Sequence, residues 1–415
     1  MQLLIFLVLT IAYITIGFQF LKNRDISVFL KLTVLLPITS SLIPLHTHFQ
    51  VNVYYFFSFI VVVAYFFQTL FKPKMDKNIV IVTALLIGFI GFYLLYDVLI
   101  YKENLKVINL LKDFKPLIFI LFGFVFLYVL KNRRLNWKGK EAKKIMKYNF
   151  IATIVWFVIL NTTGFISFAT NDPYYSVTDI RYTSVGASFI LIYYIAGLGV
   201  NRKFDKYDLA YILIPLFLSG NRTVLFTLAV IYLINMVMVT TNAIKLFSRI
   251  GVFVSAGLVL FFGVFSFNEK LRTRILTMFD YDIVMRQLIE FRFAPFIEKL
   301  NTYSWYDYFF GKGIGETIFI PWFVWRETVD NYNIYMDNIF LTLYIKYGVF
   351  SLIVVFLLIH FINQTKTNKR FKILLLIYFF IMGLTTAFMY QAKFLFILIV
   401  LASFSFETKT LNRKE

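Results

Sequence analysis

The sequence predicts an all-α membrane protein, a polytopic bundle of about 12–14 transmembrane helices with one large extracytoplasmic loop. The chain has 415 residues, of which 60% are hydrophobic and 15% are charged, and its mean hydropathy is +0.75. So few charged residues cannot cover the surface of a soluble domain with this apolar content. The apolar stretches are continuous and about 20 residues long. This pattern favours helices over the alternating strands of a β-barrel.

The expected spans follow one another with short connectors until a long polar segment interrupts them. The first lacks a basic leader and a small-residue cleavage site, so we expect a retained helix rather than a signal peptide. The last two are short enough to form a re-entrant pair instead. We predict spans at about 1–21, 26–44, 52–71, 78–100, 116–130, 148–169, 185–200, 208–220, 223–241, 249–267, 338–361, 373–389 and 394–406.

The positive charge of the chain is distributed unevenly. The formal net charge is +20, and most lysines and arginines fall in every second connector. Basic residues in short connectors stay in the cytoplasm, which places the C-terminus inside and the long polar segment outside. The excess charge therefore reports topology, and we predict the lipid bilayer rather than nucleic acid as a partner. The chain then divides into N-terminal membrane helices (1–267), the extracytoplasmic loop (268–337), and C-terminal membrane helices with a cytoplasmic tail (338–415).

Cysteine and histidine usage excludes several chemistries. The chain has no cysteine, which rules out disulfides, thiolate metal sites and cysteine nucleophiles. Its three histidines, His46, His48 and His360, cannot form a conventional zinc site without carboxylates. We therefore predict neither a metal nor another cofactor.

Three arginines are candidates for binding an anion. Arg222 follows a Ser-Gly-Asn turn between two spans, at membrane level and without an acidic neighbour in sequence. Such a charge faces a cavity or a partner, or it extends to the lipid headgroups. Arg286 and Arg292 lie in a segment that predicts a short amphipathic surface helix limited by Pro295. Arg286 has Glu290 as a possible i+4 partner, whereas Arg292 has no acid at i−4.

A glycine-rich turn and an acidic residue complete the candidate site. Gly311, Gly313 and Gly315 form a turn without the spacing of a P-loop, which bends the chain and can offer backbone N–H groups to an anion. Asp337 and Asn338 stand at the start of a span. Asp337 either caps that helix or orients and deprotonates a hydroxyl group. Lys346, Lys31 and Asp97 are further charges within apolar stretches.

In this order, the motifs resemble those of the O-antigen polymerase and O-antigen ligase superfamily of bacterial membrane glycosyltransferases. The resemblance covers about residues 215–355. It consists of a Ser-Gly-x-Arg turn, an outer loop with two arginines, a Gly-x-Gly turn, an Asp-Asn pair before a hydrophobic run, and a later glycine. The residues that carry it are Ser219–Thr223, Arg286, Arg292, Gly311–Gly315, Asp337, Asn338 and Gly348.

The resemblance implies a GT-C-like fold in the bacterial cytoplasmic membrane and a substrate linked to undecaprenyl diphosphate. The hydroxyl of a glycan acceptor would attack the anomeric carbon of the lipid-linked donor, and lipid diphosphate would leave. Arg222, Arg286 and Asp337 would be catalytic. The substrate-binding residues would be Arg292, Gly311, Gly313, Gly315 and Asn338. The product would be an O-antigen (the glycan of lipopolysaccharide), a capsule or an exopolysaccharide, and a chain-length regulator and a flippase would be partners.

One departure separates the alternatives within this family. Ligases tend to have histidine before the asparagine, whereas this chain has Asp337, which favours a polymerase and leaves the general base open. Two other classes also fit the composition: a flippase for lipid-linked oligosaccharides and a non-catalytic scaffold. A flippase rarely needs such a long outer loop, and no inverted repeat is visible in the sequence.

Overall fold

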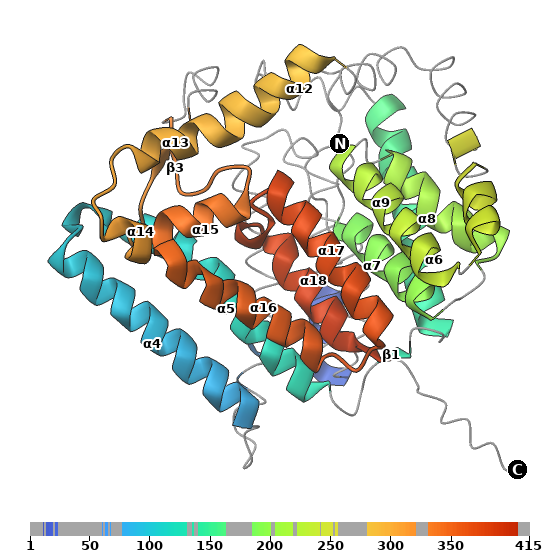
Figure 1. Ribbon diagram of the computed structural model, residues 1–415. Coiled ribbons are helices and arrows are strands. Elements are labelled where there is room, and N and C mark those ends of the chain that lie inside the picture. The colour runs from blue at the N-terminus through green and yellow to red at the C-terminus, as the bar shows by residue number, and fades with distance from the viewer. Residues whose placement is uncertain are drawn as a thin grey trace, which may run out of the picture.

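The fold is known from a computed structural model of the chain. It describes residues 77–130, 135–136, 140–162, 185–200, 204–218, 222–240, 242–251, 254–255, 280–320 and 331–405, and short pieces before residue 68. Helices dominate these residues (Figure 1), as the all-α prediction requires. The predicted spans at 1–21, 26–44, 52–71 and 249–267 lie wholly or mostly outside the described residues, as do Lys31, His46 and His48.

The first described helices form a hairpin. α4 (Lys77–Leu99) and α5 (Val107–Val129) are joined by the short 3₁₀ helix η2 (Lys102–Asn104). α4 matches its predicted span almost residue for residue, whereas α5 begins nine residues before the predicted start at 116. The sequence pattern missed this first part because it contains charged residues, but one of them, Asp113, is fully buried.

Of the four helices in the middle of the chain, α7, α8 and α9 follow the predicted spans closely, whereas α6 begins eight residues before the predicted start at 148. α7, the most buried of them, lies against α8, α9, α17 and α18, and nearly all of its residues from Phe189 to Leu198 are buried. α6 packs on α8. The four helices are α6 (Lys140–Thr162), α7 (Val185–Gly199), α8 (Lys206–Leu218) and α9 (Arg222–Val239).

The predicted extracytoplasmic loop contains helices of its own. α12 (Tyr281–Leu288), the π-helical turn η3 (Ile289–Phe293) and α13 (Ala294–Leu300) follow each other across the top of the bundle in Figure 1. The prediction that Pro295 limits this helix is wrong. Proline has no N–H and clashes with the carbonyl four residues earlier, and here it occupies the first turn of α13, directly after the wide π-helical turn.

The C-terminal region was predicted as three spans, and the first of them is divided. It forms α15 and α16, which differ in direction at the 3₁₀ turn η5 (Figure 1). η5 starts at Gly348, whose φ of +53° is in a region that favours glycine. The elements are α15 (Ile339–Tyr347), η5 (Gly348–Phe350), α16 (Ser351–Gln364), α17 (Lys369–Thr385), η6 (Phe388–Tyr390) and α18 (Ala392–Ser403).

The main hydrophobic core lies where α5, α7, α17 and α18 meet, and it extends to α4 and α16. Four strands of two residues each add local pairing. β1 (Leu135–Asn136) pairs in parallel with β4 (Phe404–Ser405), and β2 (Ile318–Phe319) pairs antiparallel with β3 (Tyr332–Asn333). The second pair joins the two sides of the loop and stabilises its base.

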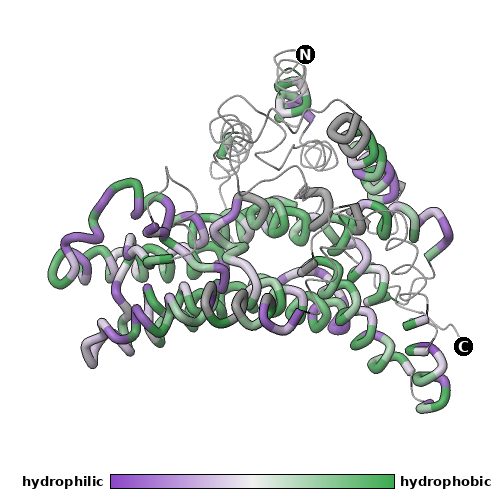
Figure 2. Tube along the Cα trace, turned by 90° about the horizontal axis from the view of Figure 1, so that it is seen from above, coloured by the Kyte–Doolittle hydropathy of each residue, from purple (hydrophilic) through white to green (hydrophobic). Residues whose placement is uncertain are grey.

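Two of the described helical segments are long and apolar enough to cross a membrane: Lys77–Leu99, and Ile339–Gln364, which comprises α15, η5 and α16. Among the other described helices, Phe189–Gly199, Thr223–Val239 and Phe394–Ser403 are apolar but shorter, below the roughly 20 residues that a span needs. Hydrophobic residues run along most of the helices, and hydrophilic ones gather in turns and at helix ends (Figure 2). This pattern supports association with a membrane.

Candidate functional site

The glycine turn fits closely between α4, α5 and the end of α15. The N–H groups of Lys312 and Gly313 donate to the carbonyls of Ile345 and Lys346 at 2.8 and 2.9 Å. Gly311 and Gly313 have φ angles of +73° and +89°. A Cβ atom on Gly313 would lie 1.6 Å from Oδ1 of Asp97. The turn therefore needs glycine both for its backbone conformation and for its close contact with α4.

Beneath the turn lies a cluster of three buried charged side chains, Asp97, Asp113 and Lys346, each fully buried. Asp97 Oδ2 accepts from the N–H of Ile314 at 2.9 Å. Asp113 Oδ2 accepts from the N–H of Gly315 at 2.6 Å and from Lys346 Nζ at 2.5 Å. The turn does offer backbone N–H groups, as the sequence predicted, but they bind the carboxyl groups of Asp97 and Asp113 in the chain itself.

Gly315, the third glycine of the turn, also allows a close contact, in this case with η2. A Cβ atom on Gly315 would lie 2.3 Å from the carbonyl oxygen of Asn104, and its φ is +86°. Lys346 Nζ donates a second hydrogen bond, to the carbonyl of Glu316 at 2.7 Å. Gly311, Gly313 and Gly315 thus hold the loop against α4, α5, η2 and the end of α15.

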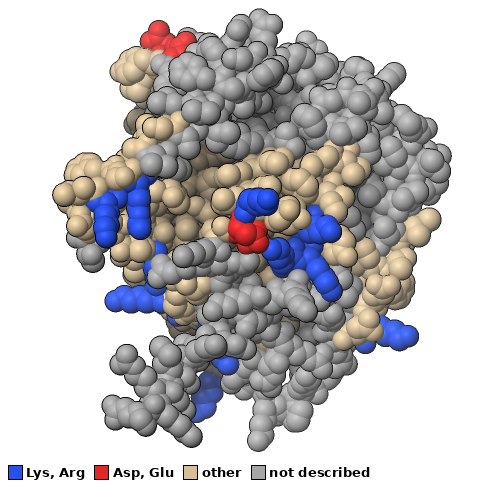
Figure 3. Space-filling view, turned by 90° about the vertical axis from the view of Figure 1, so that its right-hand side faces the viewer, with Lys and Arg blue, Asp and Glu red and all other residues tan. Residues whose placement is uncertain are grey.

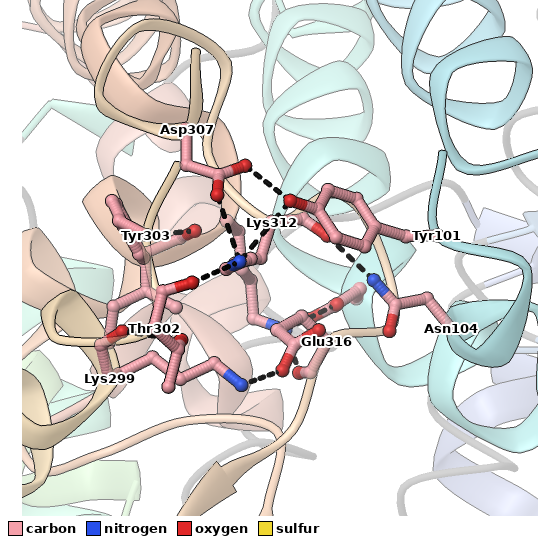
Figure 4. Close-up of polar contacts among 11 residues, drawn as sticks. Tyr101, Asn104, Lys299, Thr302, Tyr303, Asp307, Lys312 and Glu316 are labelled. Atoms are coloured by element: carbon pink, nitrogen blue, oxygen red, sulfur yellow. Dashed lines mark hydrogen bonds and ion pairs between the residues drawn. The ribbon is translucent and has the colours of Figure 1, made fainter. Parts of the chain in front are cut away.

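A second polar cluster lies closer to the surface, around Lys312 (Figure 4). Lys312 Nζ contacts Asp307 Oδ2 at 2.8 Å, the carbonyl of Thr302 at 2.8 Å and the hydroxyl of Tyr101 at 3.2 Å. The ammonium also lies 5.0 and 5.4 Å from the ring centroids of Tyr101 and Tyr303, within the range of a cation–π interaction. These contacts use the three N–H donors of the lysine, so this cluster holds the loop in place.

The same cluster is completed by hydrogen bonds from the connection between α4 and α5, where Tyr101 precedes η2 and Asn104 ends it. Tyr101 donates to Asp307 Oδ1 at 2.5 Å, and Asn104 Nδ2 donates to the carbonyl of Lys312 at 2.6 Å. Burial raises the pKa of the Tyr101 phenol, and its hydrogen bond to Asp307 raises the pKa further. Tyr101 therefore stays a neutral donor at physiological pH. Lys299 also pairs with Glu316 at the edge of the cluster.

Two predicted site residues, Arg292 and Asp337, meet at the end of the loop. Arg292 comes from η3 and donates through Nε to the carbonyl of Asp337 at 3.3 Å. Its second donor, a terminal guanidinium nitrogen, lies 3.5 Å from the carbonyl of Thr385 at the C-terminal end of α17. Both are long hydrogen bonds. Three segments far apart in sequence thus converge where α15 begins, and we call this place the junction site.

Asn338, not Asp337, caps α15. Its side chain accepts from the N–H of Leu341 at 3.1 Å, and its backbone is extended, as in an N-cap. The interpretation of Asp337 as the cap of this helix is therefore wrong, because Asp337 precedes the cap by one residue. The Asp337 side chain is half-buried. Asn338 itself is buried.

The other two predicted arginines are placed only by their backbones. Arg222 is the first residue of α9, and α8 ends at Leu218. Residues 219–221 lie outside the described residues. Arg286 lies within α12, which is continuous with η3 and Arg292. The side chains of Arg222 and Arg286, and that of Glu290, are outside the described part of the structure.

Sequence reasoning missed most of the residues that hold the loop. Lys346 and Asp97 stood out as charges in apolar stretches, but nothing in the sequence connected them to each other or to Asp113. Lys312 and Asp307 lie within the segment of the glycine turn and were not singled out. Buried ionisable residues in a membrane helix are the signal that marks such positions. Among the described residues, no three acidic or histidine side chains are grouped as metal ligands.

Comparison with known proteins identifies one family. The model of a family of unknown function, DUF6369, matches residues 23–413. The chain belongs to this family. No curated protein matches the chain. Membership of DUF6369 accounts for almost the whole length of the chain as a single family unit, and it carries no assigned activity.

Proposed function

We propose that this DUF6369 protein is a membrane glycosyltransferase that polymerises lipid-linked oligosaccharide repeat units on the outer face of the bacterial cytoplasmic membrane. The helices would form a polytopic bundle, with the loop 268–337 outside and the C-terminus inside. Among the described residues on the face shown in Figure 3, lysine and arginine outnumber aspartate and glutamate. A basic cytoplasmic surface would fit this orientation. The proposal extends to O-antigen, capsule and exopolysaccharide alike.

The junction site is the observation that carries this proposal. The guanidinium of Arg292 lies beside the N-terminal end of α15, where the helix dipole also favours negative charge. Arginine binds phosphate well because its planar group gives two parallel hydrogen bonds. Arg286 is on the helix that leads into η3. This is a suitable place for the diphosphate of a polyprenyl carrier, with the carboxylate of Asp337 next to it.

The reaction uses these groups in two roles. The acceptor hydroxyl forms a bond to the anomeric carbon of the donor as the bond from that carbon to the diphosphate oxygen breaks. The hydroxyl proton passes to the carboxylate of Asp337, which acts as general base. The electron pair of the broken bond leaves with the diphosphate. Arg292, together with Arg222 and Arg286, stabilises the negative charge that grows on this leaving group.

The test is the pattern of lipid-linked sugars in cells that carry variants of the arginines. Arg292→Ala, Arg286→Ala and Arg222→Ala should each abolish polymer and accumulate single lipid-linked repeat units on the outer face, with normal amounts of protein in the membrane. Lysine at these positions should restore only part of the polymer, because a point charge lacks the bidentate geometry. Arg249→Ala is the matched control, since Arg249 is exposed and its guanidinium bonds Thr240.

Other outcomes would identify other functions. Repeat units trapped on the inner face would indicate a flippase. Normal polymer that remains on its lipid carrier would indicate a ligase. Polymer of wild-type length and amount in all three alanine variants would falsify the diphosphate site.

A further inference from the structure

Residues Trp305, Tyr308 and Phe309 form an exposed aromatic tip at the edge of the loop. Tyr308 and Phe309 lie on the short helix α14 (Asp307–Phe310), and Trp305 directly precedes it. Trp305 is 77% exposed and Phe309 is 54% exposed. Asp307 is the only charged residue between positions 303 and 310, and it is fully buried. The tip therefore presents large uncharged rings to its surroundings, which soluble loops rarely do.

The tip is continuous with the exposed apolar surface of the candidate spans. The ring of Phe310 lies 5.9 Å from that of Phe92 on α4 and 5.5 Å from that of Phe350 on η5. On α4, Leu95 and Leu99 are exposed beside this contact. Figure 1 shows α14 at the C-terminal end of α4 and near the bend between α15 and α16. The tip thus lies at the level where α4 would leave the hydrocarbon.

The tip is also held rigidly. A Cβ atom on Gly348 would lie 2.3 Å from the carbonyl oxygen of Phe309, so the backbone of α14 is in direct contact with the bend. Asp307 is fixed by Lys312, by Tyr101 and by the N–H of Ser304 at 2.7 Å. These contacts immobilise the backbone from which the aromatic rings project. A rigid backbone keeps the rings at one depth.

We propose that the aromatic tip is inserted into the headgroup–acyl boundary of the outer leaflet and anchors the loop there. Tryptophan and tyrosine concentrate at this boundary because each has an apolar body and a polar group. Exposed Lys102 and Lys106, on the connection that follows α4, would contact lipid phosphates from the aqueous side. The proposal rests on the membrane orientation given above, and it would fix the junction site near the height of the lipid phosphates.

The test measures the depth of spin labels in proteoliposomes of phosphatidylethanolamine and phosphatidylglycerol. The chain has no cysteine, so Phe309→Cys and Tyr308→Cys each place one label. Leu95→Cys on α4 is the control for lipid exposure, and Glu298→Cys on α13, also exposed, is the control for water exposure. Labels at 309 and 308 should be relaxed strongly by oxygen and weakly by a water-soluble nickel complex, with depths near that of Leu95→Cys.

Each other outcome overturns a defined part of the argument. If the labels at 309 and 308 behave like the label at 298 while the label at 95 is in lipid, the tip is not an anchor. The proposal that α4 spans the membrane is then unaffected. If the label at 95 is also exposed to water, the membrane orientation itself is wrong. Spin–spin broadening that disappears on dilution with unlabelled protein would assign the tip to contact with a second copy. Broadening is not expected for a lipid anchor.

Discussion

Removing the buried lysine should loosen the packing of the loop against α5 and α15. Lys346→Met keeps an apolar chain of similar length but leaves Asp113 without its cationic partner, with both side chains fully buried in the native protein. Breaking a buried ion pair by removing one partner costs about 3–5 kcal/mol. The substitution also removes the hydrogen bond to the carbonyl of Glu316. We therefore expect a loss of about 3–5 kcal/mol in the free energy of unfolding.

A second substitution isolates the charge effect. In Lys346→Met/Asp113→Asn, the carboxylate is neutralised, and the Asn oxygen can still accept from the N–H of Gly315. Only the lost hydrogen bond to Glu316 remains, so the deficit should fall to about 1–3 kcal/mol. Lys299→Met is the control, since Lys299 pairs with the same Glu316 but is partly exposed, and it should cost less than about 1 kcal/mol.

The assay is unfolding in mixed micelles with increasing dodecyl sulfate, followed by tryptophan fluorescence. Limited proteolysis of the folded fraction reports on the loop separately, because a released turn should be cut between residues 311 and 320. If the double variant is no more stable than Lys346→Met, the reasoning from charge pairing fails. If Lys299→Met is as unstable as Lys346→Met, burial is not what makes the deeper pair important.

Three further predictions concern single positions. Asp337→Asn should leave the free energy of unfolding unchanged, because Asn338 caps the helix, yet polymer yield should fall by at least about a hundredfold, the lower end of the range for general bases; normal yield would dismiss the general base. Gly313→Ala should destabilise the fold by more than the roughly 1–2 kcal/mol of a positive φ, since its Cβ would overlap Asp97. Equal melting temperatures would contradict this. The pKa of the Tyr101 phenol is higher in the folded protein than in the unfolded chain, so the unfolded chain loses this proton at lower pH. The contribution of Tyr101 to stability is therefore complete below pH about 10 and is lost progressively as the pH rises above it. Tyr101→Phe should show a smaller loss of stability between neutral pH and pH about 11 than the wild type, and an unchanged loss would refute this.

The sequence by itself determined the class of the fold and the position of most described helices. The ends of α4, α7 and α9 agree with the predicted spans to within about two residues, as a continuous apolar run is a local property that needs no partner. The glycine turn could also be recognised, because positive φ angles leave a local sequence signature. The order of Arg292, the glycine turn and Asp337 along the chain was also enough to support a functional hypothesis.

Only the tertiary structure decided which of these residues meet. Asp113 and Lys346 are 233 residues apart. The sequence shows each as an ionisable residue without an evident partner, and only the fold brings the two together. Burying either alone would be costly, so the pairing favours the docking of the turn and of α15 against α5. The same holds for the junction site, where Arg292 meets the carbonyls of Asp337 and Thr385 across 45 and 93 residues. Contacts of this kind depend on how helices pack, and local sequence carries no record of that packing.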